Sequence, residues 1–222
     1  MPRAVKILEG LHTVGGSGIS SPGDCMVYLI EAFEGYVLID AGVQAGAIED
    51  NVASLGIRPE SIHALILTHC HIDHVGGAKR FEDLGAEIVA HPADADAIES
   101  GDEVRLALEY YPVVYDPVKV VRTVSDGDVL EYAPHEIRVV HTPGHTPGSI
   151  SLVVEIDGKR VLFGQDIHGP FDSSWGSSIP EWRRSMERLL ALDADVLCEG
   201  HFGVMRPAEN VRDFIQGYLA SY

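Results

Sequence analysis

Three histidines and an aspartate fall within six residues of this chain: His69, His71, Asp73 and His74. They follow the apolar run at residues 64–67, which has the composition of a buried strand. A protein core does not tolerate so many polar side chains without partners. Imidazole and carboxylate groups together suit zinc, iron or manganese, and one ion cannot easily use all four groups from so short a turn. The segment therefore predicts a metal centre of two ions.

Four other segments share one feature with this cluster: a metal-capable side chain appears where a strand-like run ends. Two histidines, His141 and His145, lie in a turn rich in glycine and proline at residues 141–149. The remaining three positions, each just beyond an apolar run, are Asp40, Asp166 and His201. These segments offer the further imidazole and carboxylate groups that a centre of two ions needs.

The full pattern resembles the metallo-β-lactamase superfamily, whose His-x-His-x-Asp-His motif matches residues 69–74. The later ligand positions of that family match His145 in a Pro-Gly-His-Thr-Pro-Gly turn, Asp166, and His201 in a Gly-His element. Every ligand position is filled in the family's order, and the match extends over residues 39–201. The resemblance implies an α/β fold of four layers, an αββα sandwich in which two mixed β-sheets pack face to face with helices outside.

The resemblance also implies how the ligands divide between two divalent ions. One ion would be held by three imidazoles, those of His69, His71 and His145. The other would be held by Asp73, His74 and His201, and Asp166 would bridge the two. Zinc is the expected metal, with iron or manganese as alternatives. Two such ions, about 3.5–4 Å apart, share a hydroxide at neutral pH, and Asp73 would orient it as a catalytic residue.

Composition is that of an ordinary globular protein. The 222 residues, 45% of them hydrophobic, suffice for one sizeable core, so we expect a single domain over residues 1–222. The sequence contains no run of about 18 apolar residues, so we expect no membrane-spanning helix. The N-terminus leads into a strand-like stretch rather than a signal peptide. A cytoplasmic location is therefore expected.

A formal net charge of −18 argues against a nucleic-acid partner, because it repels phosphate backbones. We expect a small-molecule substrate and no association with membranes, and we leave open whether the chain forms a homodimer. The three cysteines, Cys25, Cys70 and Cys198, do not describe a disulfide framework. Cys70 lies between two candidate ligands and is expected to point away from them as buried packing rather than to act as a ligand or nucleophile.

Strand-like and helical patterns alternate along the chain in two comparable halves. Residues 25–30 and 36–40 read as a hairpin, and helices are expected near residues 45–55, 78–84, 180–192 and 207–219. The stretch at residues 93–117 is acidic and partly helical, after which β-structure is expected from residue 118 to residue 124. Asp-Gly pairs at 126–127 and 157–158 fit hairpin turns. This order favours two packed sheets with helices outside.

Some polar residues near the ligand positions have two interpretations. Asp40 is either a carboxylate that accepts a hydrogen bond from a ligating imidazole or a cap before Gly42. His168 lies two residues beyond Asp166 and is a candidate for substrate contact, and Glu199 has a weaker claim to the site. Surface or structural roles are expected for the remaining histidines, which are His12, His63, His91, His135 and His141.

Two loop-like segments carry aromatic side chains that wall a substrate cleft, pack the loops down or form a subunit interface. These side chains are Tyr110, Tyr111, Tyr115, Phe171, Trp175 and Trp182. Since such loops decide specificity, the sequence does not identify the substrate.

Three functions remain open at this point. The similarity to glyoxalase II-like enzymes implies a metal-dependent hydrolase that cleaves an ester, thioester or lactone-type bond of a small molecule, and this is the function we expect. Glutathione thioesters are not expected, because only about 20 residues follow His201. The alternatives are a persulfide dioxygenase with one iron on His69, His145 and Asp166, whose motif also reads Thr-His-Cys-His-x-Asp-His, and a non-catalytic metal-binding protein.

Overall fold

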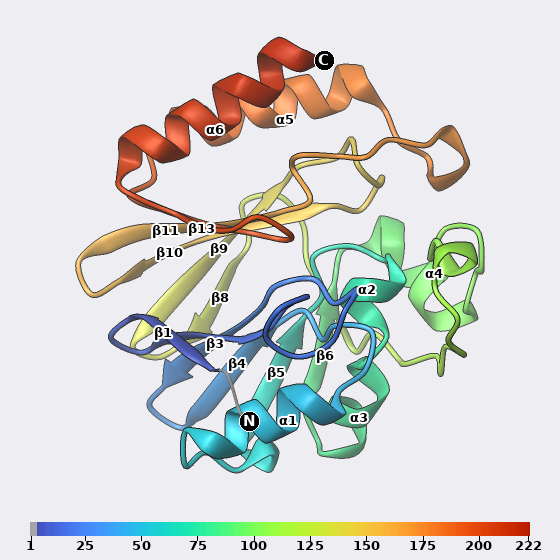
Figure 1. Ribbon diagram of the computed structural model, residues 1–222, viewed down its shortest axis with the longest axis vertical. Helices are drawn as coiled ribbons and strands as arrows, with labels where there is room; N and C mark the ends of the chain where they lie inside the picture. The colour runs from blue at the N-terminus through green and yellow to red at the C-terminus, as the bar shows by residue number, and fades with distance from the viewer. Residues whose placement is uncertain (1–3) are drawn as a thin grey trace.

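Two mixed β-sheets form the centre of the protein, as a computed structural model that describes residues 4–222 shows (Figure 1). Residues 1–3 of the predicted domain lie outside the described residues. The first sheet has the strand order β1 (Val5–Leu8), β2 (Leu11–Gly15), β3 (Val27–Ala32), β4 (Gly35–Ile39), β5 (Ile62–Ile66), β6 (Glu87–Ala90) and β7 (Arg122–Thr123). The second has the order β13 (Gly203–Met205), β12 (Val196–Glu199), β11 (Lys159–Gln165), β10 (Ile150–Ile156), β9 (His135–His141) and β8 (Val129–Tyr132).

Helices cover the outer face of each sheet, which makes four layers (Figure 1). The helices are α1 (Gly46–Ser54), α2 (Ile72–Val75), α3 (Ala78–Asp83), α4 (Pro92–Ser100), α5 (Ile179–Ala191) and α6 (Ala208–Ser221). In Figure 1, α5 and α6 lie over the second sheet, and α1 and α3 lie on the opposite side of the molecule against the first. Within residues 4–222, we find no helix long and apolar enough to span a membrane.

Alternation of side chains along the strands explains the layers. In β4 and β5, Ile39 and Ile66 belong to the apolar cluster between the sheets, whereas Leu38 and Leu65 belong to the cluster under the N-terminal helices. In β11, Phe163 faces the other sheet, and the next residue toward the N-terminus, Leu162, packs with α5 and α6. Both faces of these strands are buried, so their sequences are continuously apolar. The predicted αββα sandwich is therefore confirmed.

Two local expectations were wrong. The β-structure expected over residues 118–124 is reduced to β7, because carboxylates take the backbone N–H groups upstream: Glu82 accepts from Lys119 and Glu99 accepts from Val120, both at 2.9 Å. The Asp-Gly pair at 126–127 does not close a hairpin. It lies where the chain passes from β7 in the first sheet to β8 in the second.

Strand direction gathers the predicted ligands at one edge of the sandwich. In the first sheet, β4 and β5 are parallel, so the segments after both strands leave at the same end. In the second, β9, β11 and β12 share one direction, because β9 and β11 each pair antiparallel with β10 and β12 is parallel to β11. All predicted ligands follow the carboxyl ends of β5, β9, β11 and β12.

Gly144 allows the loop after β9 to lie against α5. Its φ is +142°, and a Cβ added there would come within 2.3–2.5 Å of the backbone and Cβ atoms of Trp182. A side chain at this position would therefore be strained and would also push α5 away from the loop that carries His145.

Replacing Gly144 by alanine is expected to destabilise the protein by more than about 3 kcal/mol, because strain and steric overlap add. Gly127→Ala is the matched control: its φ is +84°, but nothing lies within 4 Å of an added Cβ. This control should cost only about 1–2 kcal/mol of backbone strain. Urea unfolding curves measure both changes, and equal losses would contradict the packing argument.

Candidate metal centre

All seven predicted ligands lie together at the edge where the two sheets open. They form two groups in which every ligand atom lies within 4.8 Å of the others. The first group is His69, His71, His145 and Asp166. The second is Asp73, His74, Asp166 and His201. The division is the one that the resemblance implies, with Asp166 common to both groups, while the binding of ions by these groups stays a prediction.

Several ligand atoms of the two groups lie about 3 Å from one another. His71 Nδ1 lies 2.9 Å from His145 Nε2. The Nε2 atom of His201 lies 3.2 Å from Oδ2 of Asp73 and from Oδ2 of Asp166. Ligand atoms about 2.1 Å from one tetrahedral zinc ion lie about 3.4 Å from each other. The 3.2 Å contacts of His201 are near this spacing, and the 2.9 Å contact between His71 and His145 is shorter than it.

Several of these atoms are buried and have no hydrogen-bond partner among the described residues. They are His69 Nε2, His74 Nε2 and Asp166 Oδ1. Leaving a buried polar atom unsatisfied costs about 1–3 kcal/mol, and buried polar atoms in native proteins are nearly always paired. Coordination of cations would remove most of this cost, so the residues present fit a metal centre.

Protonation states also suit cations. Burial, followed by the charges of His74 and His71, holds the pKa of His69 well below its usual value, which leaves a neutral imidazole that can bind a metal. Burial opposes the charge on Asp166, but the imidazoles of His74 and His201 hold its pKa well below the usual range. At His201, burial opposes a positive charge, yet Asp166 and Asp73 raise the pKa to about 10. The carboxylates thus favour positive charge at this position.

A buried carboxylate, Asp40, supports the second ligand group from behind. His74 Nδ1 donates to Asp40 Oδ2 at 2.7 Å, so that Nε2 faces Asp73 and Asp166. Asp40 also accepts from the Thr68 amide at 2.9 Å and from the side chain of Gln165. The structure therefore favours the interpretation of Asp40 as a partner of a ligating imidazole. Gln165, held in the left-handed region at φ +51°, was not expected to take part.

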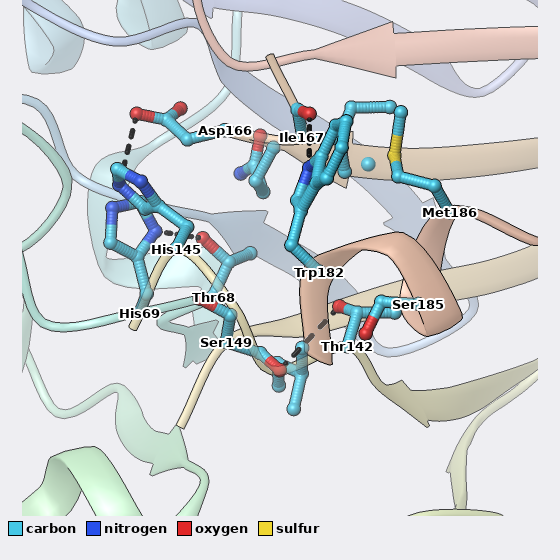
Figure 2. Close-up of a pocket in the computed structure, with 13 residues that line it drawn as sticks. Thr68, His69, Thr142, His145, Ser149, Asp166, Ile167, Trp182, Ser185 and Met186 are labelled. Carbon is cyan, nitrogen blue, oxygen red and sulfur yellow. Dashed lines mark hydrogen bonds and ion pairs between the residues drawn. The ribbon is translucent and has the colours of Figure 1, made fainter. Parts of the chain in front are cut away.

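The loop that carries His145 is fixed by its backbone and by the segment after β11. His145 Nδ1 donates to the Pro170 carbonyl at 2.7 Å, which directs Nε2 toward the ligand groups. Figure 2 shows Trp182 of α5 behind this region, where its indole Nε1 donates to the carbonyl of Ile167 at 2.7 Å. This hydrogen bond fixes the backbone next to Asp166 from the side of the sheet that α5 covers.

Asp94, in the first turn of α4, connects the two loops that carry the three histidines of the first ligand group. Its carboxylate accepts from the Cys70 amide at 3.0 Å, from the Gly148 amide at 2.8 Å and from the Thr146 hydroxyl at 2.6 Å. Sequence reasoning missed Asp94, whose signal was only an acidic residue two positions after Pro92. Cys70 is buried packing, as expected: its thiol donates to the Arg105 carbonyl at 3.2 Å, and burial raises its pKa.

His168 lies at the open side of the centre. Its Nδ1 donates to the buried Glu199 carboxylate at 2.6 Å, and its ring lines the same cavity as His201. Glu199 also accepts from the backbone amides of His201 and Phe202, at 2.7 and 2.9 Å. Glu199 therefore positions the backbone of one ligand and the ring of a candidate substrate contact.

The histidines expected to have other roles lie outside both groups. His91 and His141 stack on each other with centroids 4.0 Å apart, and His141 Nε2 donates to the Pro147 carbonyl at 2.9 Å. His135 Nδ1 donates to the Glu155 carbonyl. These contacts are structural.

A cavity of about 430 Å³ opens over both ligand groups. Its floor contains His71, Asp73, His145, Asp166 and His201. Of the aromatic side chains singled out in the sequence, those in its wall are Tyr110, Tyr111, Phe171 and Trp175. Tyr115 instead donates to the Ile98 carbonyl, and Trp182 packs in the core below α5.

Comparison with known proteins places this geometry in a family. The sequence model of the metallo-beta-lactamase superfamily matches residues 20–201, which include every ligand described above. The chain belongs to the metallo-beta-lactamase superfamily. The solved structures it is similar to include a motif mutant of the metallo-beta-lactamase from Cronobacter sakazakii, with a TM-score of 0.84 over 99% of this chain and 94% of that chain. At 23% identity, this likeness shows the fold alone.

Its relatives in sequence include proteins with and without a described activity. An uncharacterized protein of Mycobacterium leprae (strain TN) is 32% identical over 80% of this chain and 85% of its own length. Acyl-coenzyme A thioesterase MBLAC2 of Gallus gallus is 27% identical over 94% of this chain and 86% of its own length. The Homo sapiens protein of the same name is 28% identical over 96% and 85%.

Asp40→Asn is expected to weaken zinc binding about 10- to 100-fold, because His74 loses the charged acceptor that orients its ring. Competition with a chromophoric chelator measures the affinity. Asp83→Asn, the same change at an exposed carboxylate paired with Lys79, is the control and should bind zinc as the unaltered protein does. An unchanged affinity in Asp40→Asn would contradict the role given to this carboxylate.

Zinc is also expected to raise the temperature of thermal unfolding, because a ligand that binds only the folded state stabilises it. The gain is about 2.7 kcal/mol at a free concentration one hundred times the dissociation constant. Calorimetry with zinc and with a chelator measures the shift. Identical unfolding curves would show that the buried ligand atoms do not take up the metal.

Proposed function

We propose that this protein is a dinuclear metallohydrolase that cleaves an ester, thioester or lactone-type bond of a small molecule. The observation that carries the proposal is the pair of ligand groups that share Asp166 at the floor of an open cavity. Structural metal sites are closed and usually rich in cysteine. Here the ligands are imidazoles and carboxylates, and five of them face a space large enough for a substrate.

Some of the residues would hold the ions, and others would orient the reactants. His69, His71 and His145 would hold one ion. Asp73, His74 and His201 would hold the other, with Asp166 between them. When bound, two divalent ions, most simply zinc, supply Lewis acidity that lowers the pKa of a water molecule and polarises a substrate carbonyl. The chemistry thus needs no serine or cysteine nucleophile.

Asp73 is the catalytic residue of this proposal. Its carboxylate lines the cavity and lies 3.2 Å from His201 through Oδ2. A carboxylate at the cavity floor accepts a hydrogen bond from the attacking water and aims it at the carbonyl carbon of the substrate. His74 and Asp40 hold this side of the site through the 2.7 Å hydrogen bond between them.

The relatives support hydrolysis of an activated acyl bond, since acyl-coenzyme A thioesterases match this chain over nearly its full length. A dioxygenase with one iron would use His69, His145 and Asp166. Asp73 and His74 belong to a motif that the dioxygenases share, so the thioesterase relatives, rather than these two residues, favour the hydrolase. A non-catalytic metal protein would not need the cavity.

Asp166→Ala is expected to abolish hydrolysis and to reduce bound metal, since both groups lose a ligand. Elemental analysis of the zinc-loaded proteins should find about two zinc ions per chain before the substitution and fewer after it. Turnover is measured on thioesters, lactones, carboxylic esters, a phosphoester and a β-lactam.

Asp116→Ala, which removes an exposed carboxylate, is the control and should keep both metal and turnover. Full metal content with unchanged turnover in Asp166→Ala would contradict the centre of two ions. One iron per chain with consumption of O₂ would replace the hydrolase by the dioxygenase.

A further inference from the structure

The wall of the cavity is apolar on the side of the first ligand group. Tyr110 and Trp175 meet edge to face with ring centroids 6.0 Å apart. Trp175 also lies edge to face with His71, at 4.6 Å between centroids, and 6.0 Å from His145. Together with Phe171, these rings form what we term the aromatic wall, which is Tyr110, Phe171 and Trp175. The wall begins directly beside the proposed reaction centre.

Two members of the aromatic wall, Phe171 and Trp175, are held in place before any substrate binds. Trp175 is buried and ends a single 3₁₀ turn, Ser173–Trp175, that the Asp172 side chain caps by accepting from the Ser174 amide at 2.8 Å. Phe171 packs edge to face on Trp182 of α5, at 5.3 Å between centroids. A preformed apolar surface binds an apolar group without an entropic cost for ordering the wall.

Among the residues that the structure describes, imidazoles are the only side chains of the cavity lining that can carry a positive charge. Among the described residues that line it, none is Lys or Arg, and Asp172 adds a carboxylate at the rim. The whole chain carries a formal net charge of −18. A protein with this charge repels polyanionic ligands over about 8–10 Å at ordinary ionic strength. A coenzyme A thioester, with its several phosphates, would meet this repulsion.

We infer that the substrate is an uncharged ester or thioester with an apolar acyl group that lies against the aromatic wall, and that its leaving group carries no phosphate. This inference rests on the proposed hydrolase. It assigns the acyl group to the cavity between the wall and the ligand groups. The inferred substrate therefore differs from an acyl-coenzyme A, the substrate class named for some relatives of this chain, because its leaving group carries no phosphate charge.

The experiment compares two series of thioesters on the zinc-loaded protein. One series is acyl-N-acetylcysteamine, which is uncharged, and the other is acyl-coenzyme A, each with acetyl, butyryl and hexanoyl groups. Full burial of a methylene group changes kcat/KM about fourfold, so butyryl, with two more methylene groups, should exceed acetyl by about 15-fold in the uncharged series. At low salt the uncharged thioester should be cleaved faster than its coenzyme A counterpart. Added NaCl should raise only the rate for coenzyme A, because it screens the repulsion.

Variants of the wall test where the acyl group lies. Tyr110→Ala removes a side chain that is 61% exposed, so the fold should persist while the butyryl-to-acetyl ratio falls about threefold or more. Trp175→Phe should reduce the ratio less than Trp175→Ala. Val114→Ala is the control, since Val114 is 91% exposed and lies outside the cavity lining. Its ratio should be unchanged.

Failure of the inference differs from failure of the proposed function. A zinc-loaded protein that hydrolyses no ester, thioester or lactone would overturn the proposed function itself. Hydrolysis that favours acyl-coenzyme A, falls with added salt or ignores acyl length would leave the hydrolase in place and overturn the apolar, uncharged substrate. An unchanged butyryl-to-acetyl ratio in both Tyr110→Ala and Trp175→Ala would show that the acyl group lies elsewhere.

Discussion

Asp166 belongs to both ligand groups, and this sharing imposes the main constraint on the structure. Its carboxylate lies 3.2 Å from both His74 and His201 and 3.6 Å from His145, three side chains that follow three different strands. Gly200 must stay without a side chain for this arrangement, because an added Cβ would lie 2.2 Å from Asp166 Oδ1. The strands of both sheets therefore have to end at the same edge, and the positions of these side chains can vary little. The sandwich provides this by placing β5 of one sheet and β9, β11 and β12 of the other with their carboxyl ends toward the centre.

Hydrogen bonds behind the ligands convert the strand ends into a fixed site. Asp40 orients His74, the Pro170 carbonyl orients His145, and Asp94 ties the segment after β5 to the loop after β9. Asp40 and the Pro170 carbonyl each accept a hydrogen bond from Nδ1 of a histidine, so that Nε2 of the same ring points toward the ligand groups. Asp94 accepts from backbone amides beside the ligands. Such partners tune affinity for the metal as well as geometry. The protein thus keeps several buried polar atoms unpaired where cations would satisfy them.

Local patterns in the sequence predicted two packed sheets with helices outside and the metal-capable residues at the strand ends, whereas the four-layer sandwich and the division of the ligands were implied by the resemblance to the superfamily. Apolar strands with metal-capable residues at their ends, such as Ile66 followed by His69, are visible without a structure. Gln165 and Asp94 were not predicted, since their roles arise only when segments distant in sequence meet: Gln165 contacts Asp40, and Asp94 contacts Thr146. The strand expected at residues 118–124 was shortened by carboxylates from α3 and α4. Propensity does not report such tertiary competition for backbone N–H groups.

The claim on which the account rests is that the two groups around Asp166 hold two ions. Anomalous diffraction from crystals of the zinc-loaded protein, recorded on both sides of the zinc absorption edge, tests it most directly. The account predicts two peaks about 3.5–4 Å apart, one among His69, His71 and His145 and one among Asp73, His74 and His201, with the Asp166 carboxylate between them. A single peak in the first group, or none in either, would contradict it.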